Sequence, residues 1–124
     1  MSDTIHLTLP IPVSVNSAYA GKSHRHKSKK YIDWEKEALV KISEQPTYTI
    51  EGDEWLMAKY DYHMPLHYKN GKKKIQDVAN YEKALSDFLA HKIIGFKDHK
   101  IKEIILKKVE SNRNEVDISI TEIK

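Results

Sequence analysis

The chain has 124 residues, of which 40% are hydrophobic and 31% charged, a composition typical of one globular domain that covers residues 1–124. It contains no cysteine, which excludes disulfides, thiolate metal sites and cysteine nucleophiles, and its net charge of +3 is too small to indicate a nucleic-acid partner by itself. No apolar run approaches the roughly 20 residues that cross a bilayer, and the first residues lack a signal-peptide pattern, so we expect a cytoplasmic protein without membrane contact.

The first half of the chain predicts a strand, a long loop and a helix. Residues 4–9 alternate between apolar and polar side chains, as in a half-buried strand, and prolines at positions 10 and 12 follow. Residues 13–29 show no periodicity and predict a loop. From about residue 30 to 44, apolar side chains recur every three or four positions, which predicts an amphipathic helix. Its expected buried stripe consists of Tyr31, Trp34, Ala38, Leu39 and Ile42.

The second half predicts three strands and a second helix. Residues 54–64 alternate again, and residues 48–50 are expected to pair with them across a turn at Gly52 and Asp53. A helix is predicted over 77–92, and closing strands over 100–110 and 115–123. The order β-α-β(β)-α-β-β predicts an α+β fold with two helices packed on a mixed or antiparallel sheet. Four side chains are assigned to either the core or a dimer interface: Trp55, Tyr60, Tyr62 and Ile93.

The basic residues concentrate in two loops that contain no acidic residue. One lies between Asp3 and Asp33, the other between Asp61 and Asp77, and each leads into a predicted helix. Such loops attract phosphate backbones through counterion release, and both could lie at one end of the sheet; the alternative is that they are solvated surface loops. Flanking tyrosines could stack on unpaired bases or pack in the protein. The basic side chains are Lys22, Arg25, Lys27, Lys29, Lys30, Lys69, Lys72, Lys73 and Lys74, and the tyrosines are Tyr19, Tyr31 and Tyr68.

The start of the second predicted helix combines a carboxylate, an amide and a lysine. Asp77 stands where the helix begins, Asn80 and Lys83 follow within a turn and a half, and Asp98 lies in the turn after the helix. Two aspartates of this kind could hold Mg²⁺, which prefers carboxylate oxygens. They could equally be a helix cap and a turn residue, with Lys83 in a surface ion pair with Asp87. The residues by themselves leave both interpretations open.

Residues 77–83, Asp-Val-Ala-Asn-Tyr-Glu-Lys, resemble the Asp-x-Asp-Asn-x-x-Lys motif of the RusA family of Holliday junction resolvases. Asp98 falls where that family has its last aspartate, residues 9–16 are similar to its Leu-Pro-x-Pro-x-Ser opening, and residues 118–122 resemble its last strand. The resemblance implies a bacterial or bacteriophage homodimer that cuts four-way DNA junctions by paired symmetric nicks with Mg²⁺, for which Mn²⁺ can substitute.

The same resemblance implies the roles of individual residues. Asp77 and Asp98 would be metal ligands, Asn80 would support the site, and Lys83 would be the catalytic lysine that stabilises charge on the phosphate. Asn16 and the two basic loops would bind DNA. At position 79 the family has aspartate and this chain has Ala79, which keeps the helix but removes one of three expected carboxylates. We therefore expect a junction-binding chain with impaired catalysis, as an inactivated variant of an active enzyme or as a natural silent binder.

Other functional classes have less support in the sequence. The histidine pairs 24/26 and 63/67 have spacings that can chelate zinc, but no cysteine or third ligand accompanies them. No glycine-rich phosphate loop is present, so no nucleotide cofactor is expected. The main alternative is a non-enzymatic, basic nucleic-acid-binding module in which Asp77 and Asp98 are only a cap and a turn residue. A third is a small interaction domain with lysine-rich loops.

Overall fold

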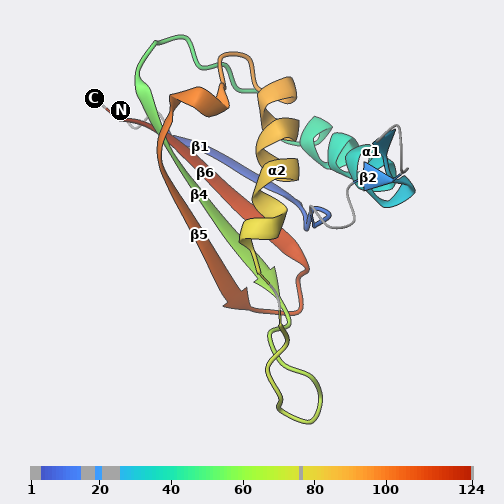
Figure 1. Cartoon of the computed structure of the whole chain (residues 1–124). Coiled ribbons are helices and arrows are strands. Elements are labelled where there is room, and N and C mark those ends of the chain that lie inside the picture. Colours follow the sequence, from blue (N-terminus) through green and yellow to red (C-terminus); the bar gives the residue numbers. More distant parts are fainter. Residues whose placement is uncertain (1–3, 15–18, 21–25, 76, 124) are drawn as a thin grey trace.

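A four-stranded mixed sheet forms the base of the fold (Figure 1). The computed structural model describes residues 4–14, 19–20, 26–75 and 77–123, and the sheet order is β1-β6-β4-β5. Strand β6 runs antiparallel to both of its neighbours, whereas β5 runs parallel to β4. The predicted α+β class with a mixed sheet is confirmed. The strands are β1 (Thr4–Pro10), β4 (Trp55–Met64), β5 (Ile101–Glu110) and β6 (Glu115–Ile123).

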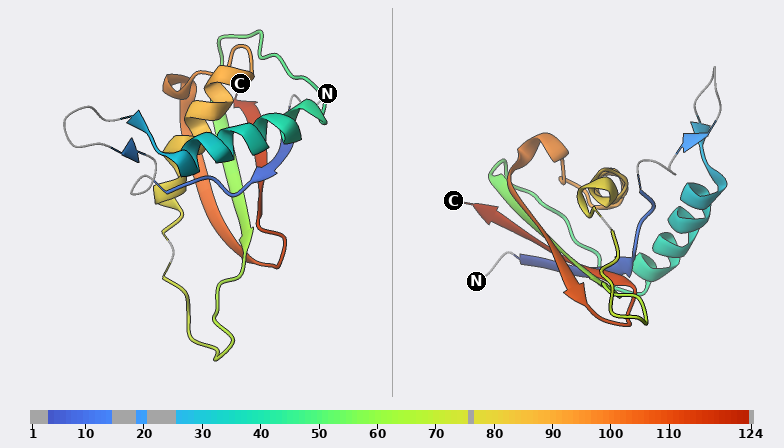
Figure 2. Two further views of the ribbon diagram at one scale, coloured as in Figure 1. Left: turned by 90° about the vertical axis from the view of Figure 1, so that its right-hand side faces the viewer. Right: turned by 60° about the horizontal axis from the view of Figure 1, so that its bottom comes forward.

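Both helices, α1 (Lys29–Ser43) and α2 (Ala79–Lys92), cover the same face of the sheet (Figure 2). Helix α1 begins at an N-cap, Ser28, whose hydroxyl accepts a hydrogen bond from the Tyr31 amide at 3.2 Å. The helices meet through Trp34 and Phe88, whose ring centroids are 5.2 Å apart in an edge-to-face contact. Leu39, predicted to be buried, is 48% exposed, because it lines an open hollow with Ile32 of α1 and Phe88 of α2.

The core lies between the helices and the inward side chains of the sheet. Tyr60 and Tyr62 of β4 are fully buried, as is Ile93 after α2, so these three belong to the core of the chain, whereas Trp55 is exposed. The Tyr60 hydroxyl lies 2.9 Å from the hydroxyl of buried Ser86. The Tyr62 hydroxyl has no hydrogen-bond partner among the described residues. Burial raises the pKa of both phenols far above the usual value.

The predicted pairing of residues 48–50 with β4 is wrong. Thr49 instead forms a parallel bridge with Ile94, and the Ile50 amide donates to the Ile94 carbonyl at 2.7 Å. The loop after α2 comes this close because Gly95 has a φ of 88°, and a Cβ atom at that position would lie 1.8 Å from the Ile50 carbonyl oxygen. Free backbone groups of this loop thus replace the expected strand partner.

Two other features differ from the sequence prediction. The long loop before α1 contains a short antiparallel pair, β2 (Tyr19–Ala20) with β3 (His26–Lys27), which is too short to show a periodicity. The last two strands follow each other in the chain but are not neighbours, since β4 lies between β5 and β6. The connection passes the end of β4, where the Ser111 amide donates to the Met64 carbonyl at 3.1 Å. Strand β5 therefore stands at one edge of the sheet.

Candidate active site

A hollow of about 420 Å³ lies between α2, the short 3-10 helix η1 (Asp98–Lys100) and the start of β5. Residues 82, 83, 86 and 87 occupy one face of α2, since positions three and four apart are neighbours on a helix. The structure thus brings together two of the predicted site residues, Lys83 from α2 and Asp98 from η1. The residues that line the hollow are Glu82, Lys83, Ser86, Asp87, Asp98, Ile101 and Ile104.

Lys83 is available to an anion in this hollow. Its ammonium lies 3.5 Å from a carboxylate oxygen of Asp87, and its side chain is 65% exposed. An exposed ion pair of this kind contributes little stability, about 0–1 kcal/mol. The ammonium can therefore leave Asp87 for a phosphate at small cost. Asp87 was predicted only as an ion-pair partner of Lys83; its place in the hollow follows from the helix face that α2 turns toward η1.

Asp77, Ala79 and Asn80 are not among the residues that line this hollow. The exposed Asp77 precedes α2, where its carboxylate accepts a hydrogen bond from the Ala79 amide at 3.0 Å and its carbonyl accepts one from the Asn80 amide. Ala79 is the first residue of α2 and stands four positions before Lys83. A side chain at position 79 thus shares the helix face of Lys83 and points toward the same side as the hollow.

The carboxylates among the described residues do not assemble a complete magnesium site. In the described part of the chain, no group of three or more histidine, cysteine, aspartate or glutamate side chains is arranged to hold a metal ion. Within the hollow Asp87 is paired with Lys83, and outside it Asp77 is bound to the amide of its own helix turn. The position from which a further carboxylate would join this surface is occupied by Ala79, which has no donor atom.

A basic hairpin, residues 66–74, projects from the end of the sheet (Figure 1). The Tyr68 amide donates to the Lys72 carbonyl and the Lys74 amide to the Leu66 carbonyl, both at 2.8 Å, and Gly71 forms the tip with a φ of 85°. Tyr68 is 57% exposed, with the Lys74 ammonium 5.4 Å from its ring centroid. The hairpin thus presents an aromatic ring beside cations, a combination suited to nucleic acid. Its lysines are Lys69, Lys72, Lys73 and Lys74.

The base of the hairpin is held by Glu110 at the end of β5. Its carboxylate accepts hydrogen bonds from the Leu66 amide at 2.8 Å and from the His67 ring at 2.7 Å. The hydrogen bond from His67, followed by that from Leu66, holds the pKa of Glu110 below its usual value. The partner of His67 is thus a carboxylate, and so is that of His63, which contacts Asp117 at 2.9 Å. These histidines do not form the zinc pair that their spacing suggested.

The other predicted basic loop is only partly described, because Asn16, Lys22 and Arg25 lie outside the described residues. The ammonium of Lys27 contacts Glu35 at 2.9 Å and that of Lys29 contacts Asp33 at 3.3 Å, while Lys30 is exposed. Tyr31 is buried, so its ring packs in the core and cannot stack on bases. The β2–β3 pair and the basic hairpin project in different directions (Figures 1 and 2), so the described part of the first basic loop does not share one end of the sheet with the hairpin.

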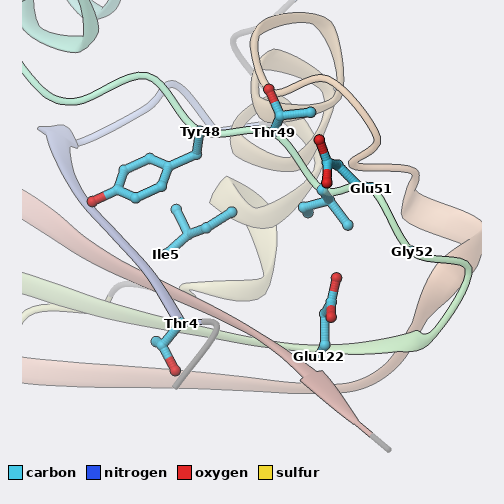
Figure 3. A pocket seen from close by; sticks show the side chains of 8 residues that line it. Thr4, Ile5, Tyr48, Thr49, Glu51, Gly52 and Glu122 are labelled. Atoms are coloured by element: carbon cyan, nitrogen blue, oxygen red, sulfur yellow. The ribbon is translucent and has the colours of Figure 1, made fainter. Parts of the chain in front are cut away.

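A second hollow, of about 380 Å³, lies between the start of β1, the end of β6 and the loop of residues 48–52 (Figure 3). Glu122 of β6 points toward the loop that carries Glu51, and the remaining lining residues contribute no cationic side chain. Its acidic lining does not suit a phosphate. The hollow with Lys83 and Asp98 is therefore the candidate active site.

A lysine and carboxylates in one open hollow, on a body from which a basic hairpin projects, suit the class of proteins that act on nucleic-acid phosphates. The family model described as Endodeoxyribonuclease RusA matches residues 10–121. The chain belongs to this endodeoxyribonuclease family, whose members are metal-dependent Holliday junction resolvases. No individual curated protein matches the chain. No helix in the described ranges is long and apolar enough to cross a membrane.

Proposed function

We propose that this chain forms a homodimer that binds four-way DNA junctions, and that alanine at position 79 impairs the paired symmetric cleavage for which its site is otherwise built. One observation carries the proposal. Lys83 and Asp98 line one hollow, while position 79, on the helix face of Lys83, has a methyl group where the family motif has a carboxylate. Loss of one ligand from a site with few carboxylates strongly reduces metal affinity or turnover.

The remaining residues retain defined tasks. The Lys83 ammonium, released from Asp87, stabilises negative charge on the phosphate that is cut. With aspartate at position 79, Asp77 and Asp98 would supply further carboxylates to Mg²⁺ or Mn²⁺, and Asn80 would support them from the first turn of α2. With Ala79 in place, the set of donor atoms that would hold the metal is incomplete.

DNA binding does not depend on position 79. The basic hairpin presents Lys69, Lys72 and Lys73 to solvent, and a dimer presents it twice. The basic loop before α1 adds Lys27, Lys29 and Lys30, together with the predicted contacts of Asn16, Lys22 and Arg25. Each phosphate neutralised by a lysine releases counterions, so binding weakens steeply with salt.

The test restores the carboxylate. Ala79→Asp is compared with the unchanged chain and with Ala79→Asn, a control of similar size without charge, on a four-way junction labelled on each strand. With Mg²⁺ or Mn²⁺ we expect symmetric nicks from Ala79→Asp only, and their loss when Lys83→Met is added. All forms should bind the junction equally. Equal inertness of Ala79→Asp and the unchanged chain, or equal cleavage by both, would contradict the proposal.

The second candidate is a natural junction-binding module without catalysis, favoured by the intact basic hairpin beside an incomplete donor set. It predicts that Ala79→Asp binds no Mn²⁺. Isothermal calorimetry with Mn²⁺ separates the two candidates, since a site built for metal gains measurable binding with Ala79→Asp and loses it again with Asp98→Asn. Binding to linear duplex as tight as to the junction would favour a general nucleic-acid module.

A further inference from the structure

We infer that the free edge of β5 binds a second copy of this chain, through an antiparallel pairing centred on Ile105. The inference rests on the homodimer of the proposed function and specifies its interface. Strand β5 forms an open edge of the sheet. It has ten residues and pairs with β4 on one side, and no described element runs along its other side (Figure 1).

The middle of this strand exposes two isoleucines, although charged side chains flank them on both sides. Ile104 is 38% exposed and Ile105 44% exposed at the middle of the strand. A long edge strand offers a row of unpaired amides and carbonyls, which templates pairing with another chain unless something covers it. Addition of a strand to such an edge is an established mode of recognition. A symmetric dimer covers the edge with the same edge of its partner.

The sequence of β5 is complementary to itself in one register. In an antiparallel pair about a two-fold axis through Ile105, that side chain meets the same residue of the partner. Glu103 then lies opposite the partner's Lys107, and Lys107 opposite the partner's Glu103, on the face away from the helices. On the helix-covered face, Ile104 lies opposite the partner's Leu106. Two opposite-charge pairs and several apolar pairs form at once, and each such cross-strand pair is stabilising.

Neighbouring registers lose this match. Centring the pair on Ile104 places Glu103 opposite an isoleucine, and centring it on Leu106 places Ile104 opposite a lysine. Intermediate registers are excluded because opposed residues must point to the same face of the sheet. In the favoured register Lys102 lies opposite the partner's Lys108, so the pairing is confined to residues 103–107. An irregularity in the β4–β5 pairing between Leu56 and Met57 falls at Lys102, at one end of this stretch.

This arrangement has a consequence for the candidate active site. A two-fold axis perpendicular to the sheet keeps both sets of helices on one face of a continuous sheet. Ile101 and Ile104 of β5 line the hollow that holds Lys83 and Asp98, so each hollow adjoins the interface. Two hollows on one face, related by a two-fold axis, suit two cuts in one junction.

Charge reversal tests the register without DNA. We expect Glu103→Lys and Lys107→Glu each to raise the dimer dissociation constant about tenfold or more, since both cross-strand pairs become repulsive. A 1:1 mixture of the two variants should restore the dimer, because lysines of one then face glutamates of the other. Glu37→Lys, on the exposed side of α1, is the matched control. Sedimentation velocity measures the mass, and circular dichroism checks that each variant is folded.

A cysteine placed on the axis gives a second readout. The chain has no cysteine, and opposed antiparallel residues have Cα atoms about 4.5–5.5 Å apart, within disulfide range. Ile105→Cys should therefore cross-link to itself on oxidation, whereas Ile94→Cys, exposed in another segment, should not. Cross-linking of both to the same extent would contradict the interface.

The outcomes separate this inference from the proposed function. A monomeric unchanged chain at micromolar concentration would overturn both the interface and the homodimer. A dimer that ignores charge reversal and does not cross-link through Ile105→Cys would overturn the interface alone. Junction cleavage enters neither readout. It is measured separately with Ala79→Asp, and its failure would overturn only the catalytic proposal.

Discussion

Tyr60 and Tyr62 form a natural comparison, because both rings are buried on the same side of β4 while only one hydroxyl is bonded. Tyr60→Phe removes the partner of the buried Ser86 hydroxyl, which lies 2.9 Å away. Leaving a buried polar group unpaired costs about 1–3 kcal/mol. Tyr62→Phe removes a hydroxyl that has no partner among the described residues, so we expect no loss, or a gain of up to about 1 kcal/mol.

The two variants should differ in unfolding free energy by about 2 kcal/mol, which for a domain of this size separates their Tm values by roughly 8 °C. Urea and thermal unfolding followed by circular dichroism measure both quantities. In a double-mutant cycle, Tyr60→Phe with Ser86→Ala should cost less than the sum of the single changes. Equal losses for both phenylalanine variants would refute the reasoning, since they would show that the Tyr62 hydroxyl also contributes a hydrogen bond.

The same tyrosines predict a limit of stability at high pH. Burial raises the pKa of each phenol in the folded state, so above about pH 10 the unfolded chain loses protons that the folded chain retains. Stability should therefore be independent of these groups below pH 10 and fall as the pH rises beyond it. Tyr62→Phe should make the fall shallower, measured as unfolding free energy between pH 8 and 11; an unchanged slope would contradict the assignment.

Three further predictions concern backbone, acid stability and DNA. Gly95→Ala should lower the free energy of unfolding in urea by more than about 2 kcal/mol, because position 95 has a positive φ and a Cβ atom there would clash with the backbone. Gly71→Ala, with a similar φ but open space around it, should lower it by only about 1–2 kcal/mol. Equal losses for the two variants would exclude the clash. Partial burial would raise the pKa of Asp117, but hydrogen bonds from an arginine and a threonine outweigh it and lower the pKa. The stability that this carboxylate contributes is therefore present above about pH 4 and lost as the pH falls. Asp117→Asn should make the unfolding free energy, measured by urea titration, depend less on pH in this acid range. Lys72→Ala with Lys73→Ala should reduce the slope of log affinity against log salt for junction binding by up to about 1.8, and an unchanged slope would place the DNA away from the basic hairpin.

Elements with a strong period were predictable from the sequence. The alternation of β4 and the three- and four-residue spacing in α2 located both elements to within one or two residues. Pairing partners were not predictable in the same way. The backbone of Thr49 and Ile50 met Ile94 rather than β4, since which free amide meets which carbonyl depends on where a distant loop passes.

In the candidate site, too, some features were predictable from the sequence and others depended on the tertiary structure. The 3.6-residue helical period alone places position 79 and Lys83 on one face of α2, so the sequence by itself determined that a side chain at position 79 lies on the same side of the helix as Lys83. Only the tertiary structure decided that Asp98 and Asp87 share a hollow with Lys83, and that Asp77 stands outside it. The reason is topological: β6 inserts between β1 and β4 and leaves β5 at the edge, which brings η1 against α2 and leaves a self-complementary strand open to a partner.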